Sequence, residues 1–370
     1  MKKVLKTSPA VFAVGENYQI IIPVTCETVM WVQVGDECFF DDSNGILRSA
    51  KSVHSVNVPR ELLDDAGKYT VCYRTLKKRK AYFTKTSDVF CETFDFYPVK
   101  GDNIHAYHIA DAHNMIEQPV ACAEFFRKET GKIDFLILNG DVPEDSSKIK
   151  HFDTIYEIVS QVTHGNIPAV FSRGNHDTRG IFAENIAEYT PCENGNSYFT
   201  FRLGSIWGVV IDCGEDKTDS NEEYGNTVCC SAFRKRETKF LENLVKNPIS
   251  EYGADGVKYR IAVAHTPFTR RYNPPFNIEE DTYSYWAKLL KENVKPHIMI
   301  CGHIHKYSVD IPGCENDAFG QPCHVIVGSE VNKKAGTFAG SGFIFSKGEI
   351  KVIFNNSKEI TQEHYIKKEL

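Results

Sequence analysis

Five short apolar runs of this sequence each lead into an aspartate, an asparagine or a histidine, and this repeated placement limits the fold more than any other feature. The runs are IHAYHIA (104–110), IDFLILN (133–139), IPAVFS (167–172), RIAVA (260–264) and HIMIC (297–301). Stretches with apolar residues at helical spacing lie between several of the runs, which predicts alternating strands and helices. Parallel strands of this kind build their binding sites at their carboxyl ends.

The residues at these five positions are types that bind metal ions. They occur in the segments Asp111-Ala112-His113, Gly140-Asp141-Val142-Pro143-Glu144, Arg173-Gly174-Asn175-His176-Asp177, His265 and Gly302-His303-Ile304-His305. Each short motif alone is weak, because such pairs arise by chance in a chain of this length. Their joint occurrence at five strand ends predicts a metal site.

The chemistry of these side chains indicates which ions they would hold. Imidazole, carboxylate and carboxamide groups suit Mn, Fe or Zn in divalent or mixed-valence form, and no cysteine stands in any of the motifs. The candidate ligands are too many for one ion, whereas one bridging carboxylate would divide them into two sites of four. Two adjacent ions are the usual arrangement for displacing an oxygen at phosphorus.

The ordered set DxH, GDxxE, GNHD, H and GHxH resembles the calcineurin-like metallophosphoesterase superfamily over residues 104 to 330. This resemblance implies a double-sheet αββα sandwich and a metal-dependent phosphatase in which a hydroxide on the metal attacks phosphorus. It implies that one ion is held by Asp111, His113 and His305, that the other is held by Asn175, His265 and His303, and that Asp141 bridges them. It also implies that His176 is the general acid for the leaving group.

Two positions depart from the purple acid phosphatases of that superfamily. His113 replaces the glycine of their DxG motif, and Glu144 replaces the tyrosine ligand of their GDxxY motif. Glu144 is a candidate for orienting His176, and the alternative is an ordinary solvated loop acid. Arg179 is a candidate for binding substrate phosphate through its planar guanidinium, and the alternative is a surface arginine.

The first part of the chain has a different pattern. Residues 1–98 contain short β-rich runs, turn clusters and no helical period, which predicts an all-β sandwich of immunoglobulin or fibronectin III type before a catalytic domain at 99–370. The segment around Tyr69 resembles the tyrosine corner of such sandwiches, in which the hydroxyl bonds to the backbone upstream. At the other end, runs at 323–328, 341–346 and 350–355 follow one another and suggest a second, meander-like sheet.

Composition limits the classes of partner that we expect. The net charge is −6 and no basic, aromatic tract is evident, so a small phosphorylated substrate is expected and nucleic acid is not. No apolar stretch is long enough to span a membrane, and no membrane partner is expected. The 12 cysteines are scattered without CxxC spacing, which predicts reduced core thiols and, in a chain with no evident secretory leader, a cytoplasmic location. The sequence does not indicate an oligomeric state.

Three functions remain open on the sequence. The leading one is a phosphatase. A phosphodiesterase or nuclease would use the same fold and ligands. A non-catalytic metal-binding scaffold would usually lack some ligands, and here none of the motif residues is missing.

Overall fold

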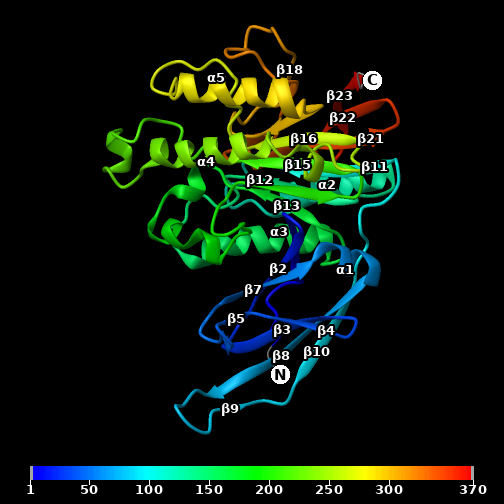
Figure 1. Ribbon diagram of the computed structural model, residues 1–370, viewed down its shortest axis with the longest axis vertical. Coiled ribbons are helices and arrows are strands. Elements are labelled where there is room, and N and C mark those ends of the chain that lie inside the picture. Colours follow the sequence, from blue (N-terminus) through cyan, green and yellow to red (C-terminus); the bar gives the residue numbers. More distant parts are fainter. Residues whose placement is uncertain (1–2, 368–370) are drawn as a thin grey trace.

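Two large sheets packed face to face form the body of the protein, with helices on both outer faces (Figure 1). The computed structural model describes residues 3–367. The first sheet has 10 strands, with the order β23 (Ile360–Lys367), β22 (Glu349–Asn355), β21 (Thr337–Ser346), β11 (Ile104–Ile109), β12 (Phe135–Asn139), β13 (Ala169–Ser172), β1 (Ala10–Val14), β2 (Asn17–Pro23) and β7 (Val53–Pro59), and β20 (Glu330–Asn332) pairs with β21.

The second sheet has six strands, in the order β14 (Phe199–Leu203), β15 (Ile206–Ile211), β16 (Tyr259–Ala264), β17 (Ile298–Cys301), β19 (His324–Val327) and β18 (Ser308–Asp310). Helices α2 (Glu117–Thr130) and α3 (Asp153–Thr163) pack on the first sheet, whereas α4 (Cys230–Leu244) and α5 (Glu280–Leu289) pack on the second. The predicted double-sheet α/β domain is confirmed.

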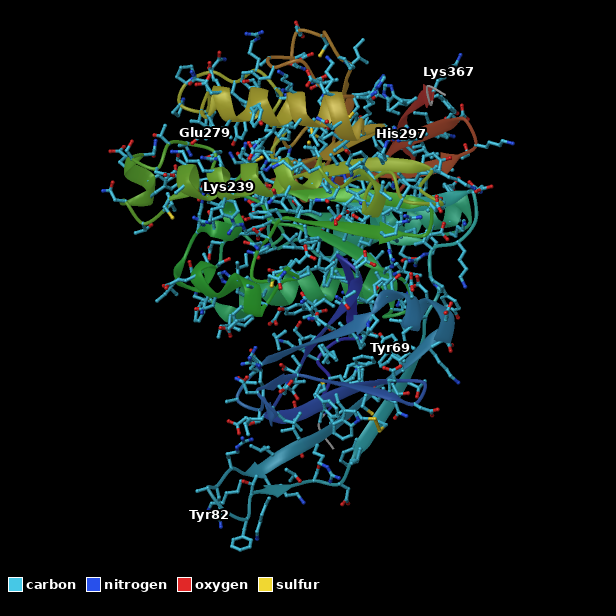
Figure 2. All side chains as sticks on the ribbon, viewed as in Figure 1. Tyr69, Tyr82, Lys239, Glu279, His297 and Lys367 are labelled. Carbon is cyan, nitrogen blue, oxygen red and sulfur yellow. A yellow bond between two sulfur atoms is a disulfide. The ribbon has the colours of Figure 1, made fainter. Side chains whose placement is uncertain are left out.

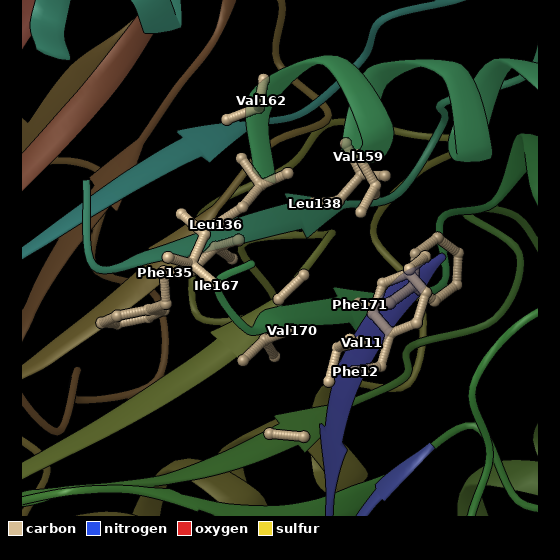
Figure 3. Packing of buried hydrophobic residues seen from close by; sticks show 14 of the residues in the cluster. Val11, Phe12, Phe135, Leu136, Leu138, Val159, Val162, Ile167, Val170 and Phe171 are labelled. Carbon is tan, nitrogen blue, oxygen red and sulfur yellow. The ribbon is translucent and has the colours of Figure 1, made fainter. Parts of the chain in front are cut away.

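The central strands are mostly apolar because both of their faces are covered. Every residue of β11, β12 and β13 is buried, and these three strands run parallel. Leu136 and Leu138 of β12 lie close to Val159 and Val162 of α3 (Figure 3). This packing holds the three parallel strands in place, so the loops after their carboxyl ends lie side by side.

The N-terminal segment is antiparallel β structure, as predicted, but one of its sheets is continuous with the sheet of the α/β domain. β1 pairs in parallel with β13 through Phe12 and Ala169, and the ring of Phe12 packs edge-on against Phe171 (Figure 3). The opposing sheet contains β10 (Phe90–Asp95), β8 (Lys68–Lys78), β3 (Thr28–Val34) and β4 (Glu37–Phe40), with β9 (Lys85–Thr86) beside β8. The domain boundary at residue 98 stays a prediction, and hydrogen bonds between β1 and β13 cross it.

Three details of the N-terminal segment differ from the sequence expectation. A short helix, α1 (Arg60–Ala66), occurs where no helical period was evident; it buries only Leu63, so the pattern was too short to detect. Tyr69 is buried, but its hydroxyl donates to the carbonyl of Gly165, 2.9 Å away and far downstream, rather than to the backbone upstream. Tyr69 therefore joins the N-terminal sheet to the loop after α3.

The expectation of reduced cysteines is wrong for one pair. Cys72 of β8 and Cys91 of β10 are directly opposite each other and form a disulfide. The other cysteines of the described chain are free, and five of them are buried, namely Cys122, Cys213, Cys230, Cys301 and Cys323. The disulfide was not expected from the cysteine spacing, and the cytoplasmic location stays a prediction.

The C-terminal strands are divided between the sheets. β19 belongs to the six-stranded sheet, whereas β21, β22 and β23 form an antiparallel meander at the edge of the ten-stranded sheet. The expectation of a second, separate sheet of 323–328, 341–346 and 350–355 is therefore wrong, although the last two runs do form part of a meander. No helix among residues 3–367 is both long and apolar enough to cross a membrane.

Candidate metal centre

The predicted ligands lie together in the loops that follow the parallel strands of both sheets. Asp111 follows β11, Asp141 follows β12 and Asn175 follows β13, all in the first sheet. His265 directly follows β16, and the segment with His303 and His305 follows β17 in the second sheet. Because the two sheets are packed face to face, their loops meet at one end of the sandwich.

The first cluster consists of Asp111, His113 and His305. Nε2 of His113 and Nε2 of His305 face each other at 3.0 Å, and Nε2 of His305 lies 3.3 Å from Oδ1 of Asp111. These atoms converge on one point, as ligands of a single ion do.

The second cluster consists of Asp141, His265 and His303. Nε2 of His265 lies 3.2 Å from Oδ2 of Asp141. The side-chain amide of Asn175 contacts Nδ1 of His303 at 3.0 Å, and it also reaches Oδ2 of Asp141 at 3.3 Å when its nitrogen faces that oxygen. The same Nε2 of His265 is 3.7 Å from Oδ1 of Asp111, so the two clusters adjoin.

The residues present fit a metal ion at each cluster. Nδ1 of His265 donates to the carbonyl of Asn139 at 2.7 Å, which leaves Nε2 directed at the carboxylates. That buried Nε2 has no hydrogen-bond partner among the described residues. An imidazole anchored through one nitrogen, with the other nitrogen directed at carboxylates, is the usual arrangement of a metal-binding histidine.

The backbone at these ligands is strained. Asp111, His113, Asp141, His303 and His305 all have positive φ, with values of 56°, 45°, 52°, 71° and 58°. Residues other than glycine rarely adopt this conformation, and such strain concentrates at functional sites. The loops also need glycine nearby, because a Cβ on Gly174 would lie 2.2 Å from Oδ1 of Asp141.

The charges of the two clusters are strongly coupled. Burial alone would raise the pKa of Asp141, but the nearby His265 holds it well below its usual value. Burial disfavours the charged form of His265, yet Asp141 and Asp111 raise its pKa to about 10, so without an ion Nε2 keeps a proton that a bound ion would displace. Burial lowers the pKa of His113 to about 4, so this imidazole is neutral at pH 7, as a metal ligand must be.

Asp177 has a structural role beside the candidate ligand Asn175. Oδ2 of Asp177 accepts hydrogen bonds from the backbone N–H groups of Gly174, at 2.7 Å, and Asp141, at 3.1 Å. It therefore ties the loop after β13 to the loop after β12. Burial, followed by the charge of Asp141, raises its pKa to about 7.

His176, the predicted general acid, lies at the edge of the clusters. Its Nδ1 donates to the backbone carbonyl of Glu144 at 2.9 Å, which directs Nε2 toward the centre. Nε2 lies 4.0 Å from Oδ2 of Asp141 and 3.3 Å from Nη1 of Arg179. The side chain is 25% exposed, so Nε2 can reach a bound substrate.

The side chain of Glu144 lies between His113 and His176, and its role in orienting His176 stays a prediction. Its Oε2 lies 3.3 Å from Nδ1 of His113 and 2.5 Å from Nζ of Lys333. Its backbone carbonyl accepts from His176, and its carboxylate lies within 4.8 Å of a ring nitrogen of His176. The carboxylate thus lies behind a candidate metal ligand, where such groups orient the imidazole and increase its basicity.

We expect Glu144→Gln to weaken metal binding at the first cluster by about 10 to 100-fold, the usual cost of removing a carboxylate behind a ligand histidine. Metal titration of the variant and the unmodified chain would measure this. The dependence of the rate on the leaving group should not change, because the anchor of His176 is a backbone carbonyl. A selective loss on substrates with poor leaving groups would show instead that the carboxylate supports His176.

Arg179 is held by acidic side chains. Its Nε and Nη2 donate to the two carboxylate oxygens of Glu215, each at 3.1 Å, and its Nη1 lies 3.3 Å from Glu223. Buried Arg234 fixes the Glu215 loop by donating to the backbone carbonyl of Cys213 at 2.8 Å. The charge of Arg179 is matched in this way, and its role in substrate binding stays a prediction.

Sequence reasoning assigned no role to Glu215, Asp216 or Lys333. Glu215 and Asp216 follow β15 in the run Cys213-Gly214-Glu215-Asp216-Lys217, and that position at a strand end was the available signal. Lys333 follows β20 in a part of the chain without a motif, so no signal pointed to it.

A cavity of about 200 Å³ opens beside His303. Its wall includes the aromatic rings of Tyr272, Phe276 and Phe319, together with Asp216 and Arg271. The ring of Tyr272 packs edge-on against His303, with 6.3 Å between their centroids. The cavity therefore leads from the second cluster to a largely aromatic surface.

The sequence matches the family model described as calcineurin-like phosphoesterase over residues 104–307. No curated protein matches the sequence. Among solved structures, the purple acid phosphatase PPD1 of yellow lupin (Lupinus luteus) is similar in fold, with 12% identity and a TM-score of 0.60 over 98% of this chain and 75% of that one. GAP50, described as the anchor in the inner membrane complex of Plasmodium, has 13% identity and a TM-score of 0.49, over 73% and 90%.

Proposed function

The chain belongs to the calcineurin-like phosphoesterase family, and on that basis we propose that it is a metal-dependent phosphatase acting on a small phosphate monoester. One observation carries this proposal: two groups of histidine and aspartate side chains adjoin at Asp141 and Asp111, which are 3.2 and 3.7 Å from the same Nε2 of His265. Mn, Fe or Zn ions at these groups would activate water as the nucleophile and neutralise the charge of the phosphoryl oxygens.

The protein's own residues supply the remaining steps. Asp111, His113 and His305 would hold one ion, Asn175, His265 and His303 the other, and Asp141 both. His176 donates a proton from Nε2 to the departing oxygen, and the carbonyl of Glu144 keeps its ring in position. Arg179, fixed by Glu215, lies beside the same Nε2, where its guanidinium would bind the phosphoryl oxygens of the substrate.

A screen of the purified chain loaded separately with Mn, Fe and Zn tests this proposal. A phosphomonoester, a phosphodiester and a nucleotide panel would be the substrates. We expect hydrolysis of monoesters that is lost on chelation and regained with metal. Faster hydrolysis of the diester would favour a phosphodiesterase or nuclease, and metal binding without turnover of any substrate would indicate a scaffold.

The cavity beside His303 would receive the alcohol portion of the substrate. Its aromatic rings favour a planar apolar group, and Arg271 stands at its wall without an ion-pair partner among the described residues. We expect Phe276→Ala to lower kcat/KM about 10-fold for naphthylmethyl phosphate, because the variant loses aromatic contact area. Ethyl phosphate is the matched control and should be hydrolysed equally by both proteins; equal losses would place the alcohol elsewhere.

The protein lacks the tyrosine ligand of purple acid phosphatases, and this affects the colour expected with iron bound. In purple acid phosphatases the colour comes from a tyrosinate on ferric iron, and here Glu144 stands at that position. Tyr107, the tyrosine in β11, directs its hydroxyl to Asn355, 3.2 Å away. The iron-loaded protein should therefore be nearly colourless, and an intense band in its visible absorption spectrum would show that a tyrosinate ligand exists.

A further inference from the structure

The turn between β8 and β9 carries the most basic and most exposed aromatic surface of the described chain. Residues 77–85, here called the basic hairpin, have the sequence KKRKAYFTK, with five cationic and no acidic side chains. All nine residues are exposed. The hairpin projects from one end of the long axis of the molecule, and Tyr82 lies at its extremity (Figure 2).

No contact among the described residues accounts for the exposed aromatic rings of this hairpin. Tyr82 is 80% exposed and Phe83 is 91% exposed, the latter with a positive φ of 59° that bulky side chains rarely adopt. The turn itself is held by Thr84, whose hydroxyl donates to the carbonyl of Lys80 at 2.9 Å. Two neighbouring exposed rings on an ordered turn therefore indicate an external partner.

The cations of the hairpin are also available to a partner. Arg79 donates to the hydroxyl of Ser49 at 2.9 Å, a neutral group. No ion pair within residues 3–367 involves Lys77, Lys78 or Lys80. The whole chain has a net charge of −6, so positive charge is concentrated here while the rest of the molecule is acidic.

From this arrangement we propose that the basic hairpin docks the protein on an anionic lipid bilayer. The two rings lie at the tip of the hairpin with lysines on both sides. In the bound state the rings enter the boundary between lipid headgroups and acyl chains, and the ammonium groups contact the lipid phosphates and carboxylates. The hairpin is a projecting tip rather than a groove, which fits a flat surface better than it fits the backbone of a nucleic acid. The acidic remainder is repelled by the same surface, so the metal clusters stay in solution.

This proposal reverses the expectation that the protein has no membrane partner. Neither the net charge of the chain nor the length of its apolar stretches reflects a short surface feature of this kind. Docking through a hairpin needs neither a basic chain nor an apolar helix.

Sedimentation with lipid vesicles tests the proposal on the full chain. We expect binding to vesicles of phosphatidylserine and phosphatidylcholine, and little binding to vesicles of phosphatidylcholine alone. The double variant Tyr82→Ser/Phe83→Ser should lower the partition coefficient at least about 10-fold, since two aromatic side chains no longer enter the lipid. Lys78→Glu/Lys80→Glu should lower it at least about 100-fold, because attraction becomes repulsion.

Matched controls lie elsewhere on the surface. Ile249, 86% exposed, serves for the aromatic pair as Ile249→Ser. Two exposed lysines serve for the charges as Lys239→Glu/Lys246→Glu, one in α4 and one in the turn that follows it. These controls should bind vesicles like the unmodified chain. All variants should keep their thermal unfolding temperature and their hydrolysis of a soluble substrate, because the hairpin lies far from the clusters.

Three results would overturn the proposal. These are equal binding to both kinds of vesicle, equal losses in the control variants, and tight binding of a single-stranded RNA by a chain that does not sediment with vesicles. The last result would assign the hairpin to nucleic acid instead.

Discussion

Asp141→Asn is expected to abolish turnover and to lower bound metal from two ions to one or none. Asp141 contacts His265 at 3.2 Å and lies within 4.0 Å of His176, so its carboxylate stands where the two clusters and the proton donor meet. A carboxamide has the same size but carries no charge and only one oxygen that can bind metal. Loss of a single stabilising group in an active site costs about 10² to 10³ in rate, and loss of the shared ligand should cost more.

Asp145→Asn is the matched control, because it changes a carboxylate four residues further along the same loop. Asp145 accepts from the backbone of Ser147 at 2.7 Å and contacts His151, outside both clusters. This control should keep both ions and full activity. Two tightly held ions in the Asp141→Asn protein, measured by elemental analysis, would refute the bridging assignment.

His176→Ala is expected to reduce the rate by about 10² to 10⁴ on a substrate with a poor leaving group, the usual contribution of general acid catalysis. The loss should shrink on a nitrophenyl phosphate, whose leaving group departs without a proton. Both ions should remain bound, because Nδ1 of His176 is engaged by the carbonyl of Glu144 and Nε2 belongs to neither of the clusters around Asp111 and Asp141.

His151→Ala is a suitable control, since His151 bonds only within its own loop through Asp145. It should leave the rate unchanged on either substrate. An equal loss of rate on good and poor leaving groups, or loss of an ion, in the His176→Ala protein would mean that His176 does not donate the proton.

The sequence predicts the central strands and the candidate metal ligands well, because both are recognised from short local patterns. A buried strand such as β12 is a continuous apolar run, and the residue at its end is read directly from the chain. The parallel order of the strands then brings Asp111, Asp141 and Asn175 to one end of the sheet without knowledge of any side-chain contact.

Features that depend on contacts between distant segments could not be predicted. β1 is a short apolar run that fits many positions, and only its pairing with β13 places it in the central sheet. The disulfide depends on the register that sets Cys72 opposite Cys91. The position of Glu144 beside His113 likewise depends on how two loops fold, and the motif spacing indicates only that an acid is near.

Metal stoichiometry with activity tests the central claim most directly. The full chain would be stripped with a chelator, titrated with Mn, Fe or Zn, and assayed for bound ions and phosphomonoester hydrolysis at each step. The arrangement of the two clusters predicts two ions per chain, with hydrolysis appearing as the second site fills. Saturation at one ion, or hydrolysis by the metal-free chain, would contradict it.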